Sequence, residues 1–328
     1  MRFLARRLGF LLIALWAATT VNFLIPRLMP GNPAEAMLGR VHGHITPSSL
    51  KALEVAFGIK NHPSLISSYF DYLNNCIHLN FGISLGPNFP EPVSKIIAQA
   101  LPWSLGLVGV STIVGFVIGT ALGAIAAWRR GGALDGILPP VFIVISAFPY
   151  FFLGLLFIWF FGLTLGWFPI LGGYTETVPP TLTWGFVGNI LDHSIMPAFT
   201  ILITSIGGWI LTMRNNMITV VAEDFVKMGR AKGLKPRRIL WQYAGRNALL
   251  PNLTGFAMSL GFVISGAILV EYVFNYPGLG FLLLQAVQNE DFPTMQALFL
   301  LITVAVLVAI FLADVATSAL DPRTRNSS

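Results

Sequence analysis

Six long stretches of this chain contain no Asp, Glu, Lys or Arg, and this feature constrains the fold more than any other. The stretches cover 8–26, 96–128, 136–175, 193–213, 247–270 and 292–313. Each can supply the roughly 20 apolar residues that a helix needs to cross the hydrocarbon core of a bilayer. With 55% hydrophobic and only 10% charged residues, the chain lies outside the range of soluble globular domains. We therefore expect an all-α integral membrane protein with six transmembrane helices.

Turn residues and interfacial aromatic residues refine the ends of these spans. The predicted spans cover about 8–28, 101–128, 137–163, 194–213, 249–270 and 294–315 of the sequence. They are joined by an external loop at 29–100 and a polar loop at 214–248, so residues 1–328 are expected to form a single transmembrane domain. The uncharged stretch 136–175 is interpreted as one span and a turn-rich tail, because two spans would place the following basic loop outside.

The formal net charge of +6 is distributed in a way that fits a membrane protein and not a nucleic-acid-binding one. If the N-terminus is cytoplasmic, 15 of the 20 basic residues face the cytoplasm, whereas nine of the 14 acidic residues face outside. This is the positive-inside pattern. We expect a multi-pass protein of the plasma (inner) membrane, with both termini and the 214–248 loop cytoplasmic.

The polar loop contains the longest polar segment in the second half of the chain, EDFVKMGRAKGLKPRRILWQYAGRNALLP, which is predicted to form two short helices. In the first helix, Val221, Phe225 and Met228 recur at i, i+4 and i+7 and are expected to share one face. Gly233 is expected to end this helix, because glycine adopts the left-handed cap conformation without steric cost. Pro236 suits the first turn of the next helix. A helix–glycine–helix unit with basic side chains and an exposed apolar face indicates a docking surface.

Several motifs resemble those of binding-protein-dependent ABC importer permeases, in the dipeptide/oligopeptide/nickel branch. GRAKGL followed by RNALLP is similar to the cytoplasmic coupling loop of that family, and RFLARRLGFLLI, YVFNYPGLG and LDPR resemble its other segments. The general loop of the superfamily has an acid where this chain has Lys227. Leu250 and Pro251 also lie farther from Gly233 than is usual. Both departures suit the peptide branch better than the sugar or phosphate branches.

The resemblance implies an ABC type I importer transmembrane fold with a cytoplasmic coupling loop. It implies as partners a second homologous permease subunit, one or two ABC ATPase subunits, an extracytoplasmic substrate-binding protein and membrane lipid, with no nucleic acid and no cofactor. The substrate would be a short peptide, a nickel chelate or an oligosaccharide. The expected ATPase-coupling residues are Glu223, Asp224, Phe225, Met228, Gly229, Arg230, Ala231, Lys232, Gly233, Leu234, Arg237 and Arg238.

A second candidate site follows the fifth span. A sharp turn there precedes a short apolar helix at 281–288, and Pro277 with Gly278 permits the chain to fold back toward the outer mouth. We predict an outer gate, with an ordinary external hairpin as the alternative. The expected gate residues are Asn275, Tyr276, Pro277, Gly278, Leu279 and Gly280.

The energy source separates the possible classes of transporter. The chain contains no G-x-x-x-x-G-K-[ST] motif, so we predict that it is not itself an ATPase enzyme. Ionisable residues are absent from the middle of the spans, and Glu271 and Asp314 lie only at span edges, which argues against proton or sodium coupling. The remaining possibility is that a separate subunit supplies the energy through a protein contact. The alternative class is a stand-alone channel or secondary carrier, in which the basic loop is only a solvated linker.

A few residues outside these sites match short patterns that are typical of other functions. Ser84 lies in a G-x-S-x-G pattern but lacks the strand and helix that a nucleophile elbow requires. His42 and His44 have no third metal ligand, so no metal site is predicted, and the lone Cys76 excludes an internal disulfide. Glycines spaced four residues apart in the second span predict close helix packing. A proline at position 149 predicts a kink in the third span.

Overall fold

The structure, a computed structural model, describes residues 2–28, 64–181, 183–264 and 267–320. Within these ranges the chain is helical, and the β-structure is limited to an isolated bridge between Ile83 and Pro92. The predicted all-α fold class is therefore confirmed for the described part. The two histidines of the external loop, His42 and His44, lie outside it.

Four helical runs are long and apolar enough to cross a membrane, and two of them are longer than predicted. The 36-residue run 93–128 and the 38-residue helix α9 extend roughly 54 and 57 Å, against a hydrocarbon core of about 30 Å. These helices therefore continue beyond the predicted span ends. The helices are α1 (Arg2–Leu28), α5 (Val93–Ser104) continuing through the π-helical η1 (Leu105–Gly109) into α6 (Val110–Trp128), α9 (Trp184–Val221) and α15 (Phe292–Leu320).

The third predicted span, at 137–163, is a broken pair of helices and not one rod. Helix α7 (Ala133–Ser146) ends just before Pro149, and α8 (Tyr150–Phe157) begins just after it, continuing into η2 (Ile158–Thr164). The two halves are bent by 93°. Proline has no N–H to donate and disfavours helical backbone at the residue before it, which accounts for the break. The sequence predicted a kink at this proline but not its size.

The fifth predicted span, at 249–270, is also interrupted. Helix α12 (Arg246–Phe262) has 17 residues, and a separate helix α13 (Ile268–Val273) follows. By length and composition the described chain thus has four candidate spans, or five if the bent pair counts as one, and six spans remain a prediction. The shorter elements are α4 (Leu65–Ile77), α10 (Asp224–Ala231), α11 (Pro236–Arg238), η3 (Ile239–Gly245) and α14 (Leu279–Gln288).

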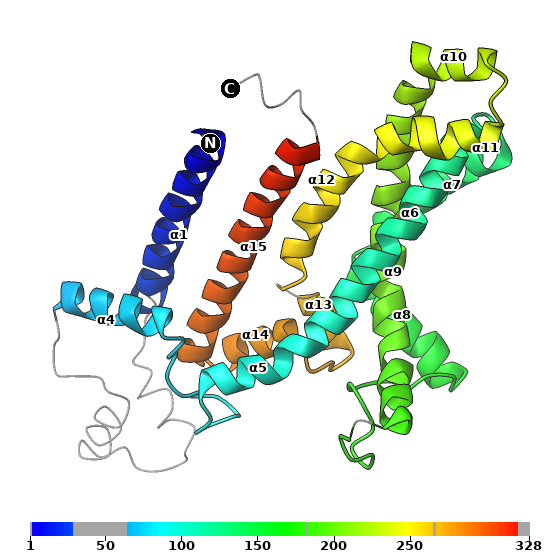
Figure 1. The fold of residues 1–328 in the computed structure, drawn as a ribbon. Coiled ribbons are helices and arrows are strands. Elements are labelled where there is room, and N and C mark those ends of the chain that lie inside the picture. The colour runs from blue at the N-terminus through cyan, green and yellow to red at the C-terminus, as the bar shows by residue number, and fades with distance from the viewer. Residues whose placement is uncertain (1, 29–63, 182, 265–266, 321–328) are drawn as a thin grey trace, which may run out of the picture.

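The most extensive helix pairing joins α6 to the second half of α9 (Figure 1). The glycine stripe of α6 faces this contact. A methyl group on Gly119 would lie 2.6 Å from Trp209 Cβ, and one on Gly123 would lie 2.5 Å from the Ile210 carbonyl oxygen. Neither distance is possible for real atoms, so the small residues set the separation of the two helices. The predicted packing role of the stripe is confirmed.

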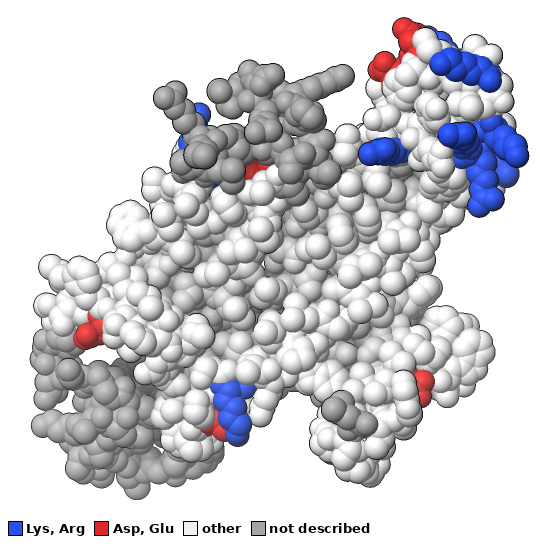
Figure 2. Space-filling model, in the orientation of Figure 1, with Lys and Arg blue, Asp and Glu red and all other residues white. Residues whose placement is uncertain are grey.

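The helices place the two candidate sites at opposite ends of the molecule. The start of α1, the end of α15 and the α10–α11 unit lie at one end in Figure 1, which we call the α10 end. Helices α5 and α14 lie at the other end, which we call the α14 end. In Figure 2 the middle of the visible face carries almost no charge, and basic side chains gather over α10, α11 and η3. This distribution suits a body surrounded by lipid with a charged extension at one end.

Candidate functional site

Helix α10 at the tip of the α10 end has one face buried and one face exposed. Val226 is fully buried and packs with Ile239 in a cluster that also includes residues of α6 and α9. Phe225 and Met228 are 39% and 58% exposed, although both are large apolar side chains. The predicted shared face of Val221, Phe225 and Met228 is wrong in one member, because Val221 is the last residue of α9. The other two residues, Phe225 and Met228, do lie on α10 and form an exposed apolar pair.

The loop after α10 has the backbone geometry of a Schellman cap. Gly233 has φ +70°, its N–H donates to the Arg230 carbonyl at 2.9 Å, and the Leu234 N–H donates to the Gly229 carbonyl at 3.2 Å. The Leu234 side chain packs beside Gly229, where an added methyl group would sit at an ordinary 3.7 Å. Pro236 then opens α11 at its first position. The predicted glycine cap and proline start are both confirmed.

Charged side chains surround the exposed apolar pair. Lys227 pairs with Asp224 at 2.9 Å, and this hydrogen bond and its charge hold the pKa of Asp224 below its ordinary value. The Arg230 guanidinium lies over the Trp128 ring, 5.2 Å from its centroid, and so connects α10 to the end of α6. The remaining basic side chains of the loop that the sequence singled out, all solvent-exposed, are Lys232, Arg237 and Arg238. The arrangement presents an apolar patch surrounded by exposed charges, which are basic at Lys227, Arg230, Lys232, Arg237 and Arg238 and acidic at Glu223 and Asp224.

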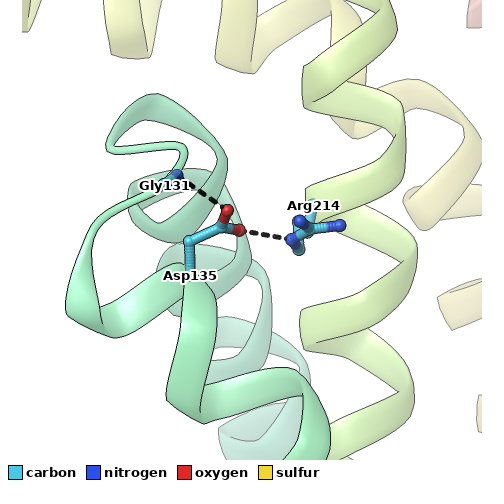
Figure 3. Close-up of polar contacts among 3 residues, drawn as sticks. All are labelled: Gly131, Asp135 and Arg214. Carbon is cyan, nitrogen blue, oxygen red and sulfur yellow. Dashed lines mark hydrogen bonds and ion pairs between the residues drawn. The ribbon is translucent and has the colours of Figure 1, made fainter.

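An ion pair connects α9, the helix that precedes α10, to the turn between α6 and α7. Arg214 Nε donates to Asp135 Oδ1 at 2.5 Å, and the Gly131 N–H donates to Asp135 Oδ2 at 3.0 Å (Figure 3). The carboxylate thus links the α6–α7 turn to α9 one and a half to two turns before α9 ends. Arg214 belongs to a regular helix, and the predicted loop 214–248 contains the last residues of α9 and the first of α12.

The structure brings all of the predicted coupling residues together at the α10 end. Gly229 is buried and Leu234 is partly buried, so these two support the loop from inside. The others are exposed: Glu223, Asp224, Phe225, Met228, Arg230, Ala231, Lys232, Gly233, Arg237 and Arg238.

The predicted gate segment is buried within the α14 end. Tyr276 is 2% exposed, its hydroxyl lies 3.0 Å from Ser194 Oγ, and its ring meets Trp103 edge to face. Leu279 is fully buried in a cluster shared by α5, α14 and α15. Asn275 is exposed and takes the left-handed backbone of the turn, with φ +51°. The short helix begins two residues earlier than predicted and packs back against the bundle.

Two residues that sequence reasoning did not assign to the gate hold it in place. Glu271, which is fully buried, accepts hydrogen bonds from Ser104 Oγ at 2.7 Å and from the Gly280 and Phe281 N–H groups at 2.7 and 3.2 Å. Ser104 Oγ also accepts the Leu279 N–H at 2.7 Å. The signal in the sequence was Glu271 itself, a single carboxylate beside an otherwise apolar span. A carboxylate is costly to bury unless it is paired.

Gly278 and Gly280 leave room for this carboxylate. An added methyl group on Gly278 would overlap the Glu271 carboxylate, and one on Gly280 would lie 2.6 Å from Ile268 Cα and 3.0 Å from Glu271 Oε2. The two glycines are therefore required by close approach. The Glu271 carboxylate occupies the start of α14, where free N–H groups favour a negative charge.

The G-x-S-x-G serine has a structural role. Ser84 is 1% exposed and donates to Asp291 Oδ2 at 2.5 Å, while Asp291 also accepts the Leu85 and Gly86 N–H groups and the Thr294 hydroxyl. These bonds attach the segment before α5 to the start of α15. Within the described residues, no group of three or more His, Cys, Asp or Glu side chains could hold a metal ion.

The fold defines a class of protein, a helical membrane protein with a charged helix–glycine–helix unit at one end. Residues 119–326 match the family described as "Binding-protein-dependent transport system inner membrane component". This match covers more than half of the chain, so the chain belongs to that family. It is a multi-pass inner-membrane permease of the ABC importer type, in a family whose members work with ATPase and substrate-binding subunits.

Three relatives that are similar to this chain over almost their whole length are named as permeases of peptide transport systems. The "Di/tripeptide transport system permease protein DppB" of Pseudomonas aeruginosa is 32% identical over 99% of this chain and 98% of its own length. The "Dipeptide transport system permease protein DppB" of Lactococcus lactis is 30% identical over 99% of both chains. The "Oligopeptide transport system permease protein AppB" of Bacillus subtilis is 33% identical over 98% of both. The resemblance identified from the coupling-loop motifs is confirmed.

Proposed function

We propose that this chain is one of two membrane subunits of an ABC importer that carries short peptides into the cytoplasm. It has no ATPase site of its own, and it pairs with a second, similar permease and with one or two separate ATPase subunits. A binding protein on the outer side delivers the substrate. Peptide as the substrate is supported by the relatives, three of which are named for dipeptide, tripeptide or oligopeptide transport.

The observation that carries the docking role is the exposed apolar pair on α10. Phe225 and Met228 stand on a helix of eight residues whose end is fixed by a Schellman cap and whose opposite face is buried. Large apolar side chains on such a rigid projection are costly to leave in water and suit a cleft in a partner. We assign this unit to the ATPase contact and place it, with both termini, on the cytoplasmic side.

We further propose that the 275–280 turn and α14 form the outer gate, with Glu271 and Ser104 as its latch. The buried carboxylate and hydroxyl bind α13, α14 and the end of α5 together at the α14 end. In this arrangement a gate closed by α14 opens when the ATPase subunits close at the other end. The helical run α5–η1–α6 and helix α9, which extend between the two ends, carry the movement (Figure 1).

Co-purification tests the docking role. We expect a Phe225→Ser and Met228→Ser double variant, purified from native membrane, to lose most of the ATPase subunit that accompanies the wild-type chain. The matched control is an Ile66→Ser and Phe70→Ser double variant, because these side chains are 72% and 63% exposed on α4, another short helix outside the α10 end. This control should retain the ATPase. Equal ATPase recovery with both variants would refute the docking assignment and favour a stand-alone channel or carrier.

A further inference from the structure

A cavity of about 500 Å³ opens beside the docking loop, where α6, α9, η3 and α12 meet. Met213, Trp241 and Leu249 form apolar walls, and Thr120, Gln242 and Arg246 add polar groups. The volume lies within the range of cavities that bind small molecules, about 300 to 1,000 Å³. None of the assigned coupling or gate residues lines this cavity.

The polar groups of the cavity are mainly hydrogen-bond donors, and two of them, Gln242 and Arg246, are exposed to solvent. Arg246 has no ion pair or hydrogen bond to any residue that the structure describes, so its guanidinium is available to a ligand in the cavity. Gln242 uses its amide oxygen to accept a bond from Arg238 at 3.1 Å, which leaves its amide N–H₂ group as the free end. A guanidinium beside an amide donor favours a carboxylate or another anion.

One wall of the cavity is formed by a residue that belongs to an incompletely satisfied polar pair. Thr120 lines the cavity, and its Oγ1 accepts a hydrogen bond from Asn252 Nδ2 at 3.3 Å. Asn252 itself is fully buried outside the lining, and its Oδ1 has no partner within the described residues. The Thr120 hydroxyl gives this wall a polar group, which a polar ligand or a water that it retains can bind and an acyl chain cannot.

We propose that this cavity is a substrate site near the cytoplasmic exit that binds the C-terminal end of a short peptide, with Arg246 holding its carboxylate. The proposal rests on the proposed function, because the cavity lies at the end assigned to the cytoplasm. The indole of Trp241 and the side chains of Met213 and Leu249 then contact the last side chain of the peptide. A dipeptide or tripeptide offers both a carboxylate for Arg246 and a side chain for the apolar walls. Inorganic phosphate would use the guanidinium alone, and a phospholipid would leave the polar wall unsatisfied.

The test is equilibrium binding of radiolabelled dialanine to the purified complex of both permeases and the ATPase subunits, with no binding protein present. We expect saturable binding that unlabelled dialanine displaces. Dialanine amide, inorganic phosphate and vesicles of an anionic phospholipid should each displace it at least about tenfold less well. Arg246→Gln should weaken binding about tenfold or more, the effect of losing one charge-assisted contact, and Arg246→Lys should restore part of it.

Arg130→Gln is the matched control, because Arg130 is an exposed arginine at the same end that does not line the cavity. It should bind dialanine like the wild type. Wild-type affinity in Arg246→Gln, or equal displacement by the amide, by phosphate or by anionic vesicles, would overturn the carboxylate assignment. Recovery of the ATPase subunit is measured in the same preparations. If the wild-type chain recovers none, the proposed function fails, whereas full recovery without peptide binding refutes only the cavity site.

Discussion

At the scale of single residues, Glu271 is the buried charge that most needs an explanation. A carboxylate without exposure is tolerated only when hydrogen bonds replace water, and here Ser104 and two backbone N–H groups do so. If α14 moves, the Gly280 and Phe281 N–H groups must separate from Glu271, and the Leu279 N–H must separate from Ser104. The sequence placed Glu271 at a span edge but could not show its partners, because Ser104 is 167 positions away.

Ser104→Ala should weaken the closed gate. The substitution removes a donor from Glu271 and an acceptor from the Leu279 N–H, and losing a hydrogen bond to a charged group costs about 1.5–3 kcal/mol. The open state then becomes more populated, and we expect ATP hydrolysis in the absence of the binding protein to rise about tenfold. The measurement is phosphate release by the complex in proteoliposomes.

Ser111→Ala provides the matched comparison for this prediction. Ser111 is also buried, two turns further along the same helical run, but its hydroxyl donates only to the Leu107 carbonyl of its own helix. Its hydrolysis rate should stay at the wild-type value. A rise in both variants would point to general loosening of the bundle, and a rise in neither would remove Ser104 from the gate.

At the scale of elements, sequence reasoning located the helices but not their ends. A stretch without charged residues indicates which part of a helix lies in lipid, so it predicted only the membrane-embedded part of α9. The same helix continues to Val221 and includes polar and charged residues there, and the sequence pattern did not predict this continuation. The break at Pro149 was predicted as a kink but not at its full 93°, and the interruption after Phe262 was not predicted, because the sequence 249–270 is uncharged throughout. The glycine cap at Gly233 and the helix start at Pro236 were predicted correctly, because caps depend on consecutive residues.

Gly123→Ala should separate α6 from α9. The new methyl group would lie 2.5 Å from the Ile210 carbonyl oxygen and 3.1 Å from the Arg214 nitrogen, both backbone atoms that cannot turn aside. Overpacking of this kind costs about 1–3 kcal/mol. We expect a lower unfolding temperature in detergent, followed by tryptophan fluorescence. Gly106→Ala, where nothing lies within 4 Å, is the control and should unfold like the wild type.

Gly233→Ala should impair docking through the backbone alone. Nothing lies within 4 Å of an added methyl group, but φ is +70°, a conformation that costs an alanine about 1–2 kcal/mol. We expect the dissociation constant for the ATPase subunit to increase about fivefold to thirtyfold. Gly136→Ala, in α7 at the same end, also has nothing within 4 Å of the added methyl group but has no positive φ, so it should bind normally. If Gly233→Ala binds as tightly as Gly136→Ala, the cap does not shape the docking surface.

At the scale of the whole molecule, the account predicts a fixed orientation. The α10 end carries most of the exposed basic charge, so it should face the cytoplasm (Figure 2). A membrane-impermeant thiol reagent applied to intact cells should label a cysteine at Ser67 but not one at Lys232, both in a Cys76→Ser background. Disruption of the membrane should make Lys232→Cys reactive. Labelling of Lys232→Cys in intact cells would reverse the orientation and with it the positions of the docking loop and the gate.

Uptake of radiolabelled dialanine into proteoliposomes tests most directly the claim that this chain is the peptide-translocating subunit of an ATP-driven importer. The vesicles contain the chain with its partner permease and ATPase subunits, oriented so that the binding protein can be added on the outer side. The account predicts uptake only when ATP, the binding protein and the ATPase subunits are all present, with loss of uptake on addition of vanadate. Uptake by the chain alone, at the same rate with or without ATP, would contradict it.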